Sequence, residues 1–166
     1  MSASKKISIC AMLTVIALIF GYIEALFPIP LPIPGLKLGL GNIVVLICIY
    51  TINSKYAFFV MIVKVILSVL LFASPSMLIY SLSGGALSYL VMITMKKHKF
   101  NIITVSIGGG VFHNLGQLAA AFFVLDSINL IYYAPFLILC GATTGAITGV
   151  ITKLITNRIH KINGRC

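Results

Sequence analysis

Long apolar runs, separated by short polar or charged stretches, follow one another along most of the chain. A helix of about twenty apolar residues is long enough to cross the hydrocarbon core of a bilayer. Six such segments can be drawn, of which the second is short for a full crossing. They lie at about 6–27, 38–51, 55–73, 76–95, 102–125 and 130–157. The pattern predicts an all-α bundle of six transmembrane helices, one transmembrane domain over residues 1–166.

Composition supports a membrane location. Of the 166 residues, 60% are hydrophobic and only 8% are charged, and the mean hydropathy is +1.15. About a quarter of the residues of a soluble domain are charged, so this chain reads as an integral protein of the cell membrane, embedded in the lipid bilayer.

The positive charges predict an orientation. The net charge of +10 comes from 12 Lys and Arg against two acids, Glu24 and Asp126. Basic residues gather on one side of a membrane, the cytoplasmic side. Here they occupy every second connection and both chain ends, so both termini are predicted to be cytoplasmic and no nucleic-acid partner is needed to explain the charge. These residues are Lys5, Lys6, Lys55, Lys96, Lys97, Lys99, Lys153, Arg158, Lys161 and Arg165.

The first outer connection, residues 28–37, places proline at alternate positions. Proline lacks the amide hydrogen that a helix needs and favours an extended, stiff backbone. Two interpretations stay open: a rigid connector, or a gate over an outward-facing cavity. The gate residues would be Pro30, Pro32, Pro34 and Gly35.

Small residues recur every four positions in two segments. Gly141, Gly145 and Gly149 do so in the sixth segment, and Ala17 and Gly21 in the first. Such faces let helices approach closely in lipid. Packing within the bundle is the simpler interpretation, while the first segment could instead meet another membrane subunit.

A polar group interrupts the fifth apolar run. At helical spacing His113 and Gln117 share a face, and Asn114 flanks them. Lipid does not solvate such side chains, so they should point into the protein or a water-filled cavity. Counted from the cytoplasmic ends, they lie at about 18 Å or deeper in a core about 30 Å thick. Glu24, Lys37 and Asn42 also fall toward the outer surface, which predicts an outward-opening binding pocket.

Lys64 is the most informative of these residues, since it lies about 14 Å from the cytoplasmic end of its segment. A Lys near the midplane costs at least about 2.5–3.5 kcal/mol on insertion scales, so it needs a partner or water. Either it pairs with Glu24, or it binds an anionic group of a ligand with help from Lys37 and His113. Because cations outnumber acids in this chain, the second interpretation favours an anionic or electron-rich small molecule.

The sequence lacks the motifs of several enzyme classes. It contains no GxxxxGK[ST] loop for ATP and no cysteine–histidine spacing typical of metal sites. With two acids, it cannot assemble a carboxylate site for magnesium diphosphate. No catalytic residue, metal site or cofactor is therefore predicted.

Four stretches together resemble a known family, the Gx transporter family, which is also labelled heptaprenyl diphosphate synthase component I. They are Pro34-Gly35-Leu36-Lys37-Leu38-Gly39-Leu40-Gly41-Asn42-Ile43-Val44, the single residue Lys64, Ser81-Leu82-Ser83-Gly84-Gly85 and His113-Asn114-Leu115-Gly116-Gln117. The family pattern often has Arg at the position of Lys64 and Ala at that of Gly41.

This family is similar in turn to the substrate-binding S components of energy-coupling factor (ECF) transporters. The similarity implies a six-helix bundle with an outward-facing pocket, working with a membrane coupling subunit and two cytoplasmic ATPases. The second label implies instead a non-catalytic membrane subunit of a heptaprenyl diphosphate synthase. A membrane scaffold without a ligand is the third interpretation. The transport interpretation accounts for the buried Lys, the polar cluster, the proline loop and the missing ATP site together.

Overall fold

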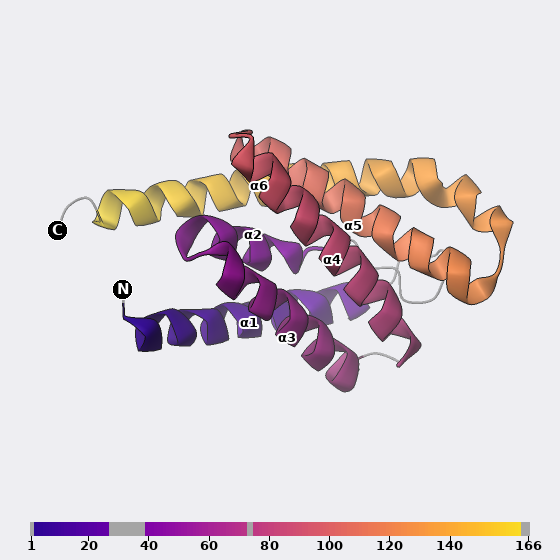
Figure 1. Ribbon diagram of the computed structural model, residues 1–166, viewed down its shortest axis with the longest axis horizontal. Helices are drawn as coiled ribbons and strands as arrows, with labels where there is room; N and C mark the ends of the chain where they lie inside the picture. Colours follow the sequence, from indigo (N-terminus) through magenta and orange to yellow (C-terminus); the bar gives the residue numbers. More distant parts are fainter. Residues whose placement is uncertain (1, 27–38, 73–74, 164–166) are drawn as a thin grey trace.

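The computed structural model describes residues 2–26, 39–72 and 75–163, and these residues form an all-helical bundle (Figure 1). The described part contains six α-helices and one short 3-10 helix, η1. Their bounds are α1 Ala3–Leu26, α2 Asn42–Thr51, α3 Ser54–Phe72, α4 Ser76–Lys97, α5 Ile102–Leu125, η1 Ile128–Tyr133 and α6 Ala134–Asn163.

The all-helical prediction is confirmed, but the second segment is shorter than expected. Five helices are long and apolar enough to cross a membrane, which indicates a multi-pass membrane protein. The exception is α2, whose 10 residues span only about 15 Å, or half of the hydrocarbon core. Residues 39–41, predicted to belong to this segment, form a turn instead. The sixth segment also differs, since the 3-10 helix η1 precedes α6.

The turn before α2 depends on Gly39. Its φ of +81° is a left-handed conformation that glycine adopts without steric cost. The Gly39 carbonyl then accepts the Asn42 amide at 2.9 Å, and the Leu40 carbonyl accepts the Ile43 amide at 3.1 Å. Because of this turn, α2 begins inside the bundle rather than at its surface.

Helix α2 is the centre of the larger hydrophobic core. Every residue from Ile43 to Ile49 is buried. A helix that is apolar on all sides needs apolar neighbours on all sides. Helices α1, α3, α4, α5 and α6 all contact α2 and supply them.

Helices α5 and α6 pack backbone to backbone (Figure 1). A Cβ atom at Gly141 would lie 2.6 Å from the Gly110 carbonyl oxygen, and one at Gly145 would lie 2.7 Å from Ile107 Cα. One at Gly149 would lie 2.9 Å from Ile103 Cα. Small residues on α6 therefore permit a closeness that larger side chains would prevent.

Both chain ends lie at the same end of the bundle in Figure 1, with the turns that join α2 to α3 and α4 to α5. We call this the terminal end. The opposite, distal end holds the last residues of α1 and the connection from α5 through η1 to α6. Large apolar side chains such as Met12, Leu70 and Phe123 are exposed on α1, α3 and α5, as lipid-facing residues would be.

Candidate functional site

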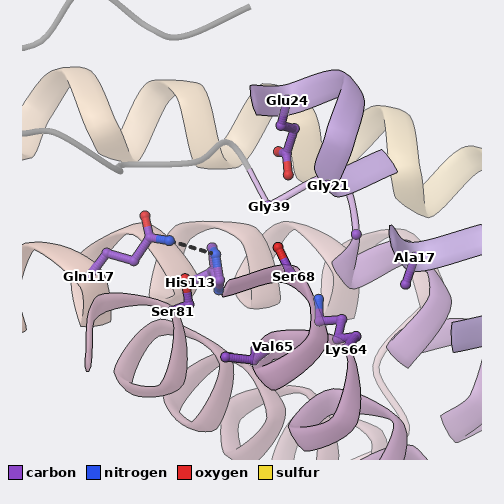
Figure 2. Close-up of a pocket in the computed structure, with 11 residues that line it drawn as sticks. Ala17, Gly21, Glu24, Gly39, Lys64, Val65, Ser68, Ser81, His113 and Gln117 are labelled. Carbon is purple, nitrogen blue, oxygen red and sulfur yellow. Dashed lines mark hydrogen bonds between the residues drawn. The ribbon is translucent and has the colours of Figure 1, made fainter. Parts of the chain in front are cut away.

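A small cavity lies among α1, α3, α4, α5 and the turn before α2 (Figure 2). Its volume is about 40 Å³. It combines two oppositely charged side chains with an imidazole, an amide and two hydroxyls. The lining residues are Ala17, Gly21, Glu24, Gly39, Gly41, Lys64, Val65, Ser68, Ser81, His113 and Gln117.

Lys64 enters the cavity from α3 and is only 9% exposed. Its ammonium Nζ donates a hydrogen bond of 2.7 Å to Asn42 Oδ1, at the first turn of α2. Gly41 lies beside this contact, since a Cβ atom there would be in van der Waals contact with Nζ at 3.4 Å. The buried charge is thus held against the beginning of α2.

Glu24 reaches the same turn from α1. Its Oε1 atom accepts a hydrogen bond of 2.8 Å from the Leu40 amide. Figure 2 shows the Glu24 carboxylate and the Lys64 ammonium on opposite sides of the cavity. The two charged side chains therefore bind Leu40 in the turn and Asn42, the first residue of α2 after it.

His113 and Gln117 form the α5 wall of the cavity. Their Nε2 atoms lie 3.1 Å apart, within hydrogen-bond distance (Figure 2). Both side chains are buried, with 5% and 1% exposure. A Cβ atom at Gly84 would lie 2.7 Å from Gln117 Cγ, and one at Gly39 would lie 2.8 Å from His113 Cδ2. Glycines on two neighbouring segments thus make the space that this pair fills.

The structure brings together four of the predicted site residues, namely Glu24, Lys64, His113 and Gln117, around one cavity. Asn42 binds Lys64 but does not line this cavity. It lines a second cavity of about 10 Å³, together with Ser106 and Thr148. Lys37 and the gate residues Pro30, Pro32, Pro34 and Gly35 lie outside the described residues.

Asn114 takes another direction. Its Nδ2 donates a hydrogen bond of 2.8 Å to the Leu137 carbonyl, and this bond ties α5 to α6. Asn114 does not line the cavity. One residue along a helix turns the side chain by about 100°, which is enough to carry it from the cavity wall to the interface with α6.

Sequence reasoning missed Ser68, Ser81 and Val65 as wall residues, and it assigned Ala17 and Gly21 to helix packing or to contact with another membrane subunit. A signal for Ser68 was present, because it follows Lys64 by four residues and so shares its face of the helix. For Ser81, no comparable spacing pointed to the cavity. Its place depends on how α4 packs against α5.

The site offers side chains suited to binding a polar molecule. No group of His, Cys, Asp and Glu suited to a metal ion occurs in the part of the chain that the structure describes. The cavity instead offers donors, acceptors and both signs of charge. A space of about 40 Å³ accommodates water but no drug-sized ligand, which needs about 300 Å³ or more. The described residues therefore form a site too small for such a ligand.

Comparison with known proteins places this bundle in a family. The family model described as heptaprenyl diphosphate synthase component I matches residues 13–155. No curated protein matches the chain, and no solved structure does. The matched range includes the turn before α2, Lys64, and the His113 to Gln117 stretch on which the resemblance was based. The chain thus belongs to the heptaprenyl diphosphate synthase component I family.

Proposed function

We propose that this chain is the substrate-binding membrane subunit of an ATP-driven importer of the ECF type. The observation that carries the proposal is the buried polar cavity, in which Lys64, Glu24, His113 and Gln117 converge inside an apolar bundle. Polar and ionisable groups within membrane segments are costly to insert and characteristically mark the path or the binding site of a substrate.

The site favours a small anionic or amphipathic ligand. Lys64 supplies a positive charge, and α2 begins beside it, so that the partial positive charge of the helix N-terminus adds to its field. In transporters, such internal helix ends face anionic substrate groups. Glu24 and Gln117 would bind donor groups on another part of the same molecule.

Substrate binding requires an opening of the cavity. Leu40 and Asn42 are held by Glu24 and Lys64, so a ligand that pairs with either charged side chain competes with the turn for it. Displacement of this turn would enlarge the site. Residues 28–37 precede the turn directly, which is consistent with a gate that includes Pro30, Pro32, Pro34, Gly35 and Lys37.

The partners follow from what the sequence lacks. No ATP-binding loop is present, so two cytoplasmic ATPases would supply the energy through a membrane coupling subunit. The basic terminal end would face the cytoplasm and the distal end the outside. Ala17 and Gly21 of α1 are buried and line the cavity, so a contact between α1 and the coupling subunit would use exposed side chains of this helix, such as Met12 and Ile16.

The family description supports a second candidate function, that of a membrane subunit accompanying a prenyl diphosphate synthase. The chain would then be non-catalytic, because two acids cannot form the magnesium–diphosphate sites of such an enzyme. In that case the cavity would bind part of a prenyl diphosphate or serve the structure alone.

The test is an affinity purification of the chain from its native membranes in mild detergent, with the bound proteins identified by mass spectrometry. Recovery of a coupling subunit with two ATPases is the expected result. Recovery of a soluble prenyl diphosphate synthase would overturn the transport proposal in favour of the second function. Recovery of neither partner would also overturn it and leave a solitary carrier or a scaffold.

A further inference from the structure

The charges of this protein are segregated along the bundle. The acids Glu24 and Asp126 lie at or near the distal end, at the last turn of α1 and the C-cap of α5. Among described residues, every Lys and Arg except Lys64 lies at the terminal end, where no acid balances them. These cations are Lys5, Lys6, Lys55, Lys96, Lys97, Lys99, Lys153, Arg158 and Lys161.

Two of these cations have a place within the bundle. Lys96 donates a hydrogen bond of 2.5 Å to the Ile49 carbonyl at the end of α2, and its ammonium lies 4.7 Å from the centre of the Tyr50 ring. The Lys6 ammonium lies 5.8 Å from the centre of the Tyr56 ring. These contacts contribute to the stability of the fold, which explains the positions of Lys6 and Lys96 without a partner.

The cations of α6 have no such role. Lys153, Arg158 and Lys161 are exposed, and within the described part of the chain their side chains form no hydrogen bond or ion pair. Lys153 and Lys161 lie eight residues apart on one face, with Asn157 between them and Arg158 alongside. The buried residues Thr152 and Thr156 occupy the opposite side of the helix. We call Lys153, Arg158 and Lys161 the basic face.

The length of α6 sets the depth of this face. Its 30 residues span about 45 Å, which exceeds a hydrocarbon core of about 30 Å by roughly ten residues. Counted from Ala134, the helix leaves the core near Leu154. Arg158 and Lys161 then lie at the level of the lipid headgroups, and Lys153 can extend its ammonium to the same level. The last turns of α6 run to the terminal end in Figure 1.

We propose that the basic face of α6 binds the phosphate groups of acidic phospholipids. Charge complementarity supports this partner, because three exposed cations meet no acid of this chain. Apolar side chains favour a lipid over a soluble protein, since Leu154 is 63% exposed and Ile151 41% exposed just where the helix leaves the core. The inference is independent of any transport role.

The experiment compares lipid adducts by native mass spectrometry. The full chain is reconstituted in nanodiscs of equal phosphatidylcholine and phosphatidylglycerol, then released, and the ratio of bound phosphatidylglycerol to phosphatidylcholine is recorded. The test variant is Lys153→Gln/Arg158→Gln/Lys161→Gln. The matched control is Lys153→Arg/Arg158→Lys/Lys161→Arg, which exchanges the cations but keeps the charge.

Phosphatidylglycerol is expected to dominate the adducts of the natural chain and of the control. Each cation near an anionic surface contributes about a fivefold preference, so the glutamine variant should lose most of the enrichment. High salt should reduce the enrichment of the natural chain as well. Equal enrichment in the glutamine variant, or none in the natural chain, would overturn the proposal. Unchanged thermal unfolding of both variants in phosphatidylcholine would establish that they fold.

Discussion

Four residues around the turn before α2 act as a unit at the residue scale. Glu24 and Lys64 bind the turn from two helices, while Gly39 lies against His113 on a third. Side chains from three helices, α1, α3 and α5, therefore contact the same short segment, residues 39–42. A change in any one of these contacts should therefore alter both the stability of the turn and the access to the cavity.

Replacing Lys64 tests its role toward a ligand. Lys64→Met removes the ammonium, and a charge-assisted hydrogen bond contributes about 1.5–3 kcal/mol, so ligand retention should fall roughly 10- to 100-fold. Lys64→Arg should retain more ligand because it keeps the charge. The measurement is mass spectrometry of small molecules released by heating the purified chain. Lys55→Met, at an exposed position, is the control, and equal retention by the natural chain and Lys64→Met would contradict a ligand role.

Gly39→Ala tests the geometry of the turn. The alanine would adopt φ near +81° and place Cβ 2.8 Å from His113 Cδ2. We expect a loss of about 1–2 kcal/mol in unfolding free energy, since the left-handed conformation costs about that much. Thermal unfolding in mild detergent measures it. Gly41→Ala is a close control, because Gly41 has φ −61° and its nearest neighbours would be 3.4 Å away. Equal midpoints for both variants would show that the turn is not constrained as described.

Much of the site could be predicted from single residues, and the reason is the cost of polar groups in lipid. That cost marks Lys64, Glu24, His113 and Gln117 without knowledge of the fold. It could not distinguish Asn114, which satisfies the same cost by binding a backbone carbonyl of α6. A buried polar side chain can face a cavity or bind the backbone of another helix. The choice depends on which helix lies next to it, and the sequence alone does not give that neighbour.

At the scale of the elements, apolar length predicted the long helices well. The predicted bounds 102–125 of α5 agree with the structure, because Asn101 caps its first turn by accepting the Ile103 amide. The bounds of α2 could not be obtained in this way. Leu40 is as apolar as the residues of α2, so hydropathy does not exclude it from the helix. The turn that holds Leu40 depends on the left-handed backbone of Gly39.

The contact between α5 and α6 offers a test at this scale. Gly145→Ala would place Cβ 2.7 Å from Ile107 Cα and Ser106 O, and a backbone cannot yield as a flexible side chain does. We expect a destabilisation of about 1–3 kcal/mol, typical of overpacking. Gly21→Ala is the control, since its nearest neighbour would be Ser68 Oγ at 3.5 Å. A lower thermal midpoint for Gly21→Ala than for Gly145→Ala would refute this account.

For the whole molecule, the common position of the two chain ends predicts reporter behaviour. A green fluorescent protein fused to either terminus should fluoresce, and alkaline phosphatase fused to either terminus should be inactive, because both termini are predicted to be cytoplasmic. The readouts are whole-cell fluorescence and phosphatase activity. An active phosphatase at only one terminus would mean an odd number of crossings and would contradict the bundle shown in Figure 1.

The shortness of α2 has a consequence for biogenesis. A segment of 10 residues is too short to be stably inserted by the translocation machinery on its own, since that needs about 20 apolar residues. Because α2 is apolar on every side and is buried by five other helices, it can reach its place only after the later helices have been synthesised. The topology of the first half of the chain would therefore be established late. Until α5 and α6 have been synthesised, α2 would remain at the translocon or at the lipid boundary. Assembly of this protein is then a post-insertion event, open to assistance by membrane chaperones.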